Sequence, residues 1–251
     1  MMRLSRLAVA AAAFAICGAA HATEFVQNGD FTQTPGGLGQ LGYNGISATD
    51  WSVLAPPNSY TFVFNQGATP VNGQYGGVSL WTQANGGNVP SGNNTWDGYS
   101  SIGSAHNFVG MDSDFQTSAL TQTINGLVVG QQYTLTFDYA FGQQAGFTGA
   151  TTGQWTFSLG GATSQTSVYS VPSAGFTGWQ SESATFTATS ASEVLSFLAS
   201  GNPQVPPFAL LSNVELNGPS AAPGPGPATG PLAVLGLLAL GYARLRARGQ
   251  A

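Results

Sequence analysis

The stretch QQYTLTFDYAF, residues 131–141, decides the fold class. Large apolar residues occupy every second position from Tyr133 to Phe141, and Thr134, Thr136 and Asp138 lie between them. Because successive side chains of a strand point to opposite faces, a period of two places the large residues on one face. The stretch therefore predicts a β-strand with one buried face.

The same period recurs at 155–159, 184–188 and 195–199, where Val194 and Leu198 predict burial on both faces. Weaker strand candidates are 25–26, 60–64, 78–81, 108–111, 120–124, 166–169 and 208–216. Outside the two chain ends no long helical period occurs. Many short strands between Gly, Asn and Pro residues predict an all-β fold, an antiparallel jelly-roll β-sandwich. Its expected core includes Tyr133, Phe137, Phe157, Phe186 and Phe197.

Charge is unevenly distributed along the chain, which carries a formal net charge of −5. The five arginines lie at the two ends, there is no lysine, and all ten acidic residues lie between the arginines. A body without cations cannot neutralise phosphates, which argues against nucleic acid as a partner. It also forms no salt bridges, so its fold must rest on apolar burial and backbone hydrogen bonds.

Residues 1–22 have the pattern of a secretory signal peptide. Arg3 and Arg6 precede an apolar segment, residues 7–17, and Ala20-His21-Ala22 is a small-x-small site for signal peptidase. An uncleaved anchor and a lipoprotein modified at Cys17 are the alternatives. Cleavage after Ala22 would remove that cysteine, and the mature chain would then form neither disulfides nor thiolates.

Residues 219–251 comprise three successive segments. A linker rich in Pro, Gly and Ala, residues 219–231, precedes an apolar run, residues 232–243, and a cluster of Arg244, Arg246 and Arg248. A helix over the apolar run is about 18 Å long, short of the roughly 30 Å hydrocarbon core. The basic end would stay in the cytoplasm. We expect a short hydrophobic helix in transient contact with the inner membrane.

This tail resembles a PEP-CTERM sorting signal over residues 225–251. Such signals are processed by an exosortase-like enzyme in exopolysaccharide-producing bacteria. The family's Pro-Glu-Pro is Pro225-Gly226-Pro227 here, which puts the processing enzyme in doubt more than the sorting. The resemblance implies a final place at the cell surface, the outer membrane or the extracellular matrix. An ordinary C-terminal membrane anchor is the alternative.

Three segments of the body, residues 23–218, resemble galactose-binding-like jelly rolls, a group that includes many carbohydrate-binding modules. FVQNGDF at 25–31 resembles the family's opening strand, and Trp51 stands where the family has a core tryptophan. Residues 124–137 resemble its "I.GL..G..Y.L.F" strand pair, and FALLSNVEL at 208–216 resembles its closing strand. The three occur in the family's order.

The resemblance also implies a structural Ca²⁺ between the first and last strands. The family's acidic ligand positions are Thr32 and Ser212 here, with Asp30 and Glu215 close to them in sequence. Ca²⁺ requires six to eight oxygen ligands, several of them charged. A second candidate is the pair Asp112 and Asp114, whose carboxylates share one face if the segment is extended. The alternative is two solvated loop acids.

The sequence predicts no catalytic residue. The mature chain has one histidine, His106, with no acid beside it, and a triad or a zinc site needs more than that. Asp112, Asp114 and Asp138 are carboxylates that a glycosidase could use, but no motif frames them. The chain is therefore expected not to be an enzyme.

Ligand binding is better supported, by a Gly-, Asn- and Ser-rich segment at 83–107. Sugar sites combine a flat aromatic face with amide and carboxylate groups that bind hydroxyls. This segment supplies those types in Asn93, Asn94, Trp96, Asp97 and Tyr99. The alternative is that Trp96 folds back and caps the sandwich.

These observations predict an exported, non-enzymatic module that binds polysaccharide, neutral because the body is acidic. A structural matrix or coat protein without a discrete ligand is the first alternative. A polysaccharide-active enzyme is the second.

Overall fold

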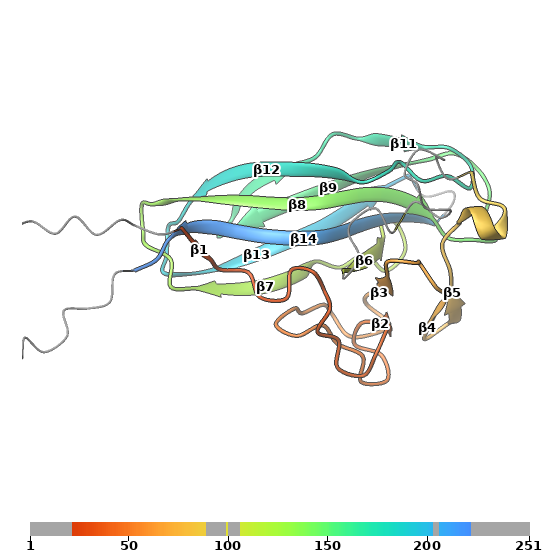
Figure 1. Ribbon diagram of the computed structural model, residues 1–251, viewed down its shortest axis with the longest axis horizontal. Coiled ribbons are helices and arrows are strands. Elements are labelled where there is room, and N and C mark those ends of the chain that lie inside the picture. Colours follow the sequence, from red (N-terminus) through yellow and green to blue (C-terminus); the bar gives the residue numbers. More distant parts are fainter. Residues whose placement is uncertain (1–21, 89–98, 100–105, 203–205, 222–251) are drawn as a thin grey trace, which may run out of the picture. The chain divides into compact units, whose positions relative to one another are not determined.

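The computed structural model describes residues 22–88, 99, 106–202 and 206–221, and it shows two antiparallel sheets packed face to face (Figure 1). The seven-stranded sheet contains β1 (Ala22–Glu24), β2 (Gly39–Gln40), β3 (Thr61–Asn65), β6 (Asn107–Asp112), β8 (Gln132–Gln143), β12 (Gln180–Thr187) and β14 (Pro207–Pro219). The five-stranded sheet contains β7 (Leu120–Asn125), β9 (Thr151–Leu159), β10 (Ala162–Gln165), β11 (Tyr169–Val171) and β13 (Ser192–Gly201). The prediction of an all-β jelly-roll sandwich is confirmed.

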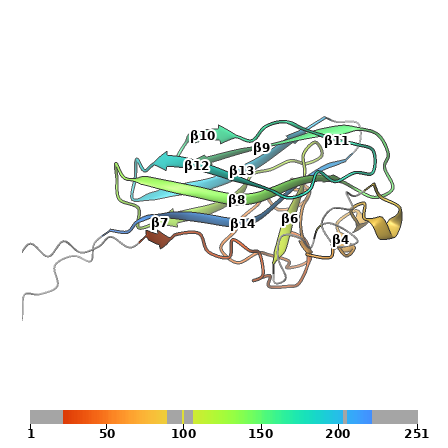
Figure 2. The ribbon, with the colours of Figure 1, turned by 45° about the horizontal axis from the view of Figure 1, so that its top comes forward.

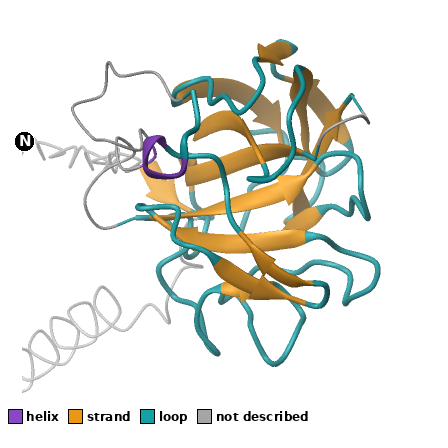
Figure 3. Ribbon diagram, turned by 90° about the vertical axis from the view of Figure 1, so that its right-hand side faces the viewer, coloured by secondary structure: helices purple, strands orange, loops and turns teal. Residues whose placement is uncertain are grey.

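Two small elements complete the described part. A hairpin of β4 (Val71–Gly73) and β5 (Gly76–Val78) forms a separate two-stranded sheet. A single 3₁₀ turn, Gln83–Asn85, follows it and is the purple coil in Figure 3. The chain divides into two compact units, Met1–Ser220 and Ala221–Ala251. Neither the expected signal segment nor the expected C-terminal helix lies within the described residues.

The predicted strand at 131–141 is β8, the second strand in the order β12-β8-β14-β6-β3-β2 of the seven-stranded sheet. It pairs antiparallel with β12 on one side and β14 on the other. Figure 2 shows this β12–β8–β14 layer in front of β9 and β13 of the five-stranded sheet. The apolar face of β8 lies between the sheets, as its period of two predicts.

The main core fills the space between the two sheets. Tyr133, Phe137, Phe157, Phe186 and Phe197 are all buried in it, which confirms the predicted core. Phe137 contacts the rings of Phe157 and Phe197 edge-to-face, with ring centroids 4.9 and 5.1 Å apart. Aromatic rings favour this geometry because their edges are positive and their faces negative.

A second hydrophobic cluster lies on the opposite face of the seven-stranded sheet. It covers the end of the sheet formed by β3, β6, the last part of β8 and the first part of β14. Its members include Tyr60, Phe62, Phe64, Tyr99, Phe108, Ala140, Phe176, Phe208 and Leu210. These strands are therefore buried on both faces at that end, and β3 shows no polar alternation.

Several predictions from the pattern are wrong in detail. Val194 and Leu198 are 48% and 41% exposed, because β13 buries one face only. Phe25–Val26 follows β1 rather than forming a strand, and only parts of 78–81 and 166–169 are strand. The strands at 120–125 and 132–143 are consecutive but belong to opposing sheets, so they do not pair.

The opening motif, residues 25–31, packs against β14 with the two backbones in close contact. Gly29 accepts a hydrogen bond from the Val214 N–H on its carbonyl oxygen, at 3.1 Å. A β-carbon at Gly29 would lie 1.9 Å from the Val214 oxygen, so no larger residue fits. Trp51 is buried, and its indole N–H donates to the Asn28 carbonyl at 3.0 Å. Glycine is thus required where the first segment crosses β14.

Candidate functional site

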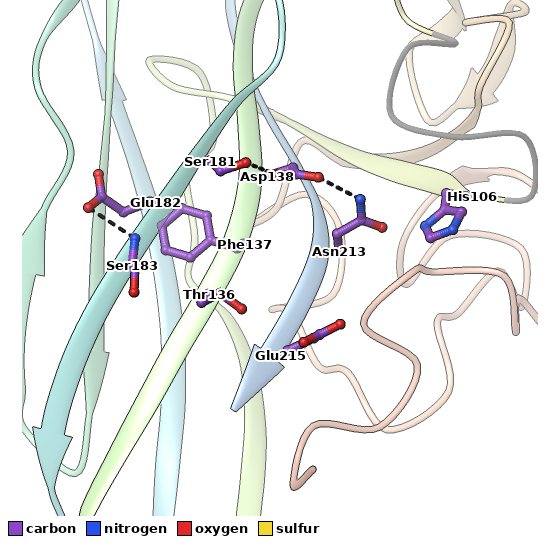
Figure 4. A pocket seen from close by; sticks show the side chains of 9 residues that line it. All are labelled: His106, Thr136, Phe137, Asp138, Ser181, Glu182, Ser183, Asn213 and Glu215. Carbon is purple, nitrogen blue, oxygen red and sulfur yellow. Dashed lines mark hydrogen bonds between the residues drawn. The ribbon is translucent and has the colours of Figure 1, made fainter. Parts of the chain in front are cut away.

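The open half of the outer face of the seven-stranded sheet carries a hollow. The second cluster leaves uncovered the part of the face formed by β8, β12 and the later residues of β14. A cavity of about 480 Å³ lies there. Its lining residues are His106, Thr136, Phe137, Asp138, Ser181, Glu182, Ser183, Asn213 and Glu215 (Figure 4).

Strand register explains why polar side chains gather in this hollow. Thr136 and Asp138 are outward positions of β8, since Phe137 and Tyr139 point into the main core. Ser181 of β12 stands beside Asp138, and Ser183 stands beside Thr136. On the other side of β8, Glu215 of β14 also stands beside Thr136. Neighbouring strands lie about 4.8 Å apart, so hydroxyl, amide and carboxylate groups recur at that spacing across the hollow.

Asp138 joins the three strands through its carboxylate. Its Oδ1 accepts a hydrogen bond from the Ser181 hydroxyl at 2.5 Å, and its Oδ2 accepts one from the Asn213 amide at 2.6 Å. Asn213 lies in a β-bulge of β14 and has a left-handed backbone, φ 50°. Asparagine tolerates this conformation better than most residues. The bulge directs the Asn213 amide toward Asp138 (Figure 4).

The hollow has an acidic character. Besides Asp138 it is lined by the exposed Glu215; Glu182 borders it from the edge strand β12, but this residue stands opposite Phe137 in the register, so its side chain is on the inner face of the strand. No Lys or Arg occurs anywhere between residues 7 and 243. A carboxylate can only accept hydrogen bonds, so these groups suit a ligand that donates them.

His106 stands at the edge of the hollow beyond Asn213 (Figure 4). Its Nδ1 atom is buried and has no hydrogen-bond partner. An imidazole nitrogen can donate or accept, depending on the tautomer.

Most of the predicted sugar-binding residues cannot be placed. Asn93, Asn94, Trp96 and Asp97 lie outside the described residues. Tyr99, by contrast, is fully buried in the second cluster, where its ring stacks on Phe108 at 5.7 Å. Its hydroxyl donates to the Trp81 carbonyl at 2.9 Å. The prediction of Tyr99 as a stacking face is therefore wrong, because its ring is part of a core.

Asp112 and Asp114 do not share a face as the extended segment would require. Asp112 ends β6 and is buried, whereas Asp114 lies in the following turn and is exposed. The Asp112 Oδ1 accepts the backbone N–H groups of Asp114 and Phe115, both at 3.0 Å. The carboxylate thus stabilises a turn, and the turn separates the two acids.

The other calcium candidates also have protein partners. The Asp30 carboxylate accepts the N–H and the hydroxyl of Thr32, and Glu215 accepts the Asn217 amide at 3.3 Å. Across the described ranges, no three His, Cys, Asp or Glu side chains come together as a metal site. These donor sets do not fit an ion that needs six to eight oxygens.

The targeting residues lie mainly outside the described part. Ala20, Pro225, Gly226, Pro227, Arg244, Arg246 and Arg248 cannot be placed, and Ala22 begins β1, opposite Pro219. Within the described ranges, no helix is both long and apolar enough to span a bilayer.

The sequence pattern predicts few of the residues that line the hollow. The polar positions Thr134, Thr136 and Asp138 were visible as the outer face of one strand. Their partners on β12 and β14 were not, because the register between strands distant in sequence is not encoded in any local pattern.

Comparison with known proteins gives neither a family nor a curated relative: no family model and no curated protein matches the chain. Solved structures do match. A CBM61 module in complex with β-1,4-galactotriose is 13% identical over 77% of this chain and 97% of that one, with a TM-score of 0.40. The CBM22-1 xylan-binding domain of a Paenibacillus barcinonensis protein is 9% identical over 73% and 92%, with a TM-score of 0.34.

A Stig cyclase from Fischerella sp. TAU matches at a similar level, 16% identical over 80% of this chain and all of that one, with a TM-score of 0.40. Binding modules and a cyclase thus stand side by side among the similar structures. Likenesses of this strength carry no argument about what the chain binds or catalyses.

Proposed function

We propose that this chain is an exported, non-enzymatic protein that binds neutral polysaccharide, and that the hollow over β8, β12 and β14 holds the sugar. The observation that carries the proposal is the set of hydroxyl, amide and carboxylate groups that three paired strands present together in one cavity. Sugar hydroxyls donate to carboxylates and exchange hydrogen bonds with Ser, Thr and Asn side chains. Trp96 remains the proposed stacking residue, next to Asp97 and near Asn93 and Asn94 in sequence.

Electrostatics restricts the ligand to uncharged polymers. All ten acidic residues lie in the body, residues 23–218, which contains neither Lys nor Arg. Such a surface repels anionic polymers and leaves neutral ones unaffected. Added salt should therefore change the binding little. Because the candidate calcium ligands have protein partners, a chelator should leave the binding unchanged as well.

A glycan array of neutral and anionic polysaccharides, with and without chelator, tests the ligand class. The site is tested by Thr136→Val, which removes one hydroxyl from the hollow without changing side-chain size. Losing one hydrogen bond should weaken binding about 3- to 10-fold. Thr163→Val is the matched control, since Thr163 is an exposed strand residue on β10 of the other sheet.

The outcomes separate the proposed function from its rivals. Equal effects of the two threonine variants would exclude the hollow as the site. Binding to no glycan at all would favour a structural matrix or coat protein. Release of shorter sugars from the bound polymer would show an enzyme. Strong binding to an anionic polysaccharide that salt abolishes would overturn the argument from charge.

Export and sorting form a separate part of the proposal. We propose that signal peptidase removes residues 1–22, and that the segments 219–231 and 232–251 direct the protein through an exosortase-like enzyme to the cell surface or matrix. The apolar run and the Arg cluster support this. Mass spectrometry of the mature surface protein should find no peptide beyond about Pro231. Intact Ala251 on the outer surface or in the medium would contradict it.

A further inference from the structure

A pair of exposed aromatic side chains lies apart from the hollow, where β6 ends near the β4–β5 hairpin. Tyr75 is 60% exposed and Phe115 is 46% exposed, and their ring centroids are 5.7 Å apart. Of the large exposed apolar side chains in the described residues, one other is aromatic, Phe147. No ring contact involves Phe147 there, so Tyr75 and Phe115 form the one exposed aromatic pair of the described part.

The position of Tyr75 is unusual for a tight turn. Val71 pairs with Val78 and Gly73 with Gly76, so Gln74 and Tyr75 form the two-residue turn of the β4–β5 hairpin. Gly, Asn and Asp dominate such turns because of their backbone freedom. An exposed tyrosine there gains little from burial, so its ring is available for a ligand.

The buried ring of Tyr60 packs beneath the exposed pair. Tyr60 belongs to the second cluster, and its ring lies 5.9 Å from Tyr75 and 5.4 Å from Phe115. Its other neighbours are Phe62 at 4.7 Å and Phe208 at 6.5 Å, both fully buried. The exposed rings therefore continue a packed core to the surface.

Hydrogen bonds fix the pair in place. The Gln116 amide donates to the Tyr75 hydroxyl at 2.8 Å and accepts from the Gln74 amide at 3.0 Å. The Gln74 N–H donates in turn to the buried Gln40 side chain at 2.8 Å. On the other side, the Phe115 N–H donates to Asp112. Both rings are thus held in position before any ligand binds, which lowers the entropy cost of binding.

We propose that Tyr75 and Phe115 form a second sugar contact, on which the C–H face of a pyranose ring of a neutral polysaccharide stacks. The ligand class is that of the proposed function, on which this inference rests. Amide groups of Gln74 and Gln116 beside the rings supply donors and acceptors for the sugar hydroxyls. Aromatic faces with adjacent amides are the chemistry that recognises sugars.

The size and charge of the surface favour a sugar over a macromolecule with a large footprint. An aromatic side chain presents at most about 150–250 Å², and these two are only about half exposed. A stable protein interface needs about 800 Å² on each partner. An anionic membrane surface would be repelled by a body without Lys or Arg.

The aromatic pair lies apart from the hollow, so it would be a second contact with the polymer. Phe208, next to Tyr60, and Asn213 of the hollow are five residues apart on β14, or about 17 Å along a strand. A long polymer that contacts both places gains avidity, because the second contact forms at high effective concentration. A short oligosaccharide contacts one place and does not.

The test is retardation of the purified protein in native gels that contain soluble galactan, xylan or β-glucan. Tyr75→Ala and Phe115→Ala should each weaken retardation by the bound polymer about fivefold, since each removes one stacking face. Phe147→Ala is the matched control, because it truncates an equally exposed but isolated ring. Tyr75→Trp should retain the retardation.

A second readout excludes a purely structural effect. Addition of the polymer should shift the backbone amide NMR signals of Phe115 and Gln116 in the wild-type protein. Unchanged retardation in Tyr75→Ala and Phe115→Ala, with weakened retardation in Thr136→Val, would overturn this inference and keep the hollow. The reverse would keep the aromatic contact and exclude the hollow. A wild-type protein retarded by none of the polymers would overturn both.

Discussion

The Asn213 side chain donates a hydrogen bond to Asp138 across β14 and β8, at 2.6 Å, from the bulge where the register of the two strands shifts. The left-handed backbone of Asn213 and its amide hydrogen bond occur at the same residue. Asn213→Ala should lose both and lower the free energy of unfolding by about 1–3 kcal/mol.

Asn213→Gly separates the two contributions, because glycine adopts the left-handed backbone without strain. It should be about 1 kcal/mol more stable than Asn213→Ala in urea denaturation. Equal stabilities of the two variants would show that the bulge does not hold residue 213 in this conformation.

A second prediction concerns Gly29, where the opening segment crosses β14. Gly29→Ala would place a β-carbon 1.9 Å from the Val214 carbonyl oxygen, so the backbone must move apart. We expect a loss of about 3 kcal/mol or more in the free energy of unfolding. Gly77→Ala is the control, since its β-carbon would meet nothing closer than 4.0 Å. Similar losses at both positions would contradict the close approach at Gly29.

A third prediction tests which face of the strands is buried. Phe137→Ala removes a buried ring from the main core and should cost about 3–5 kcal/mol in the free energy of unfolding. Val194→Ala and Leu198→Ala truncate exposed side chains of β13 and should change it by at most about 0.5 kcal/mol. A cost below about 1 kcal/mol for Phe137→Ala, measured by denaturant unfolding, would show the opposite face to be buried.

These residues also show what the sequence could predict about the fold. On β13 and the first part of β8 one face is buried and the other faces water, so polar and apolar residues alternate. On β3 the residues Phe62, Val63 and Phe64 are all buried, because each face of the strand meets a hydrophobic cluster. A strand buried on both sides has no alternation, so the second cluster could not be predicted from a period of two.

The candidate site was harder to predict because its contacts are distant in sequence. Asp138 bonds to Ser181, 43 residues away, and to Asn213, 75 residues away. No local pattern sets these pairs. Tyr75 and Phe115 likewise meet through tertiary packing on Tyr60. Conversely, Tyr99 lies in a Gly- and Asn-rich segment yet is buried, so loop composition did not indicate exposure there.

The last prediction concerns the pH dependence of stability through Asp112. Burial raises the pKa of this carboxyl from 3.8 to about 6, and the hydrogen bonds from Phe115 and Asp114 offset only part of that increase. Below about pH 4 the group is protonated in both the folded and the unfolded protein. Between about pH 4 and pH 6 the unfolded protein releases the proton first, so the free energy of unfolding falls as pH rises. The shift of roughly two units corresponds to a loss of about 3 kcal/mol.

Asp112→Asn should remove this contribution, because the asparagine carbonyl can still accept both turn N–H groups and carries no charge. The variant should unfold at higher urea concentration than the wild type at pH 7 and at nearly the same concentration at pH 4. Burial also raises the pKa of Glu24, and the pKa of Glu193 is lowered because hydrogen bonds from Thr189 and Ser190 outweigh its burial. Glu24 and Glu193 are present in both the wild type and the variant, so their contributions cancel when the two free energies of unfolding are subtracted. A difference that is constant from pH 4 to pH 7 would show that the pKa of Asp112 is not raised in the folded protein.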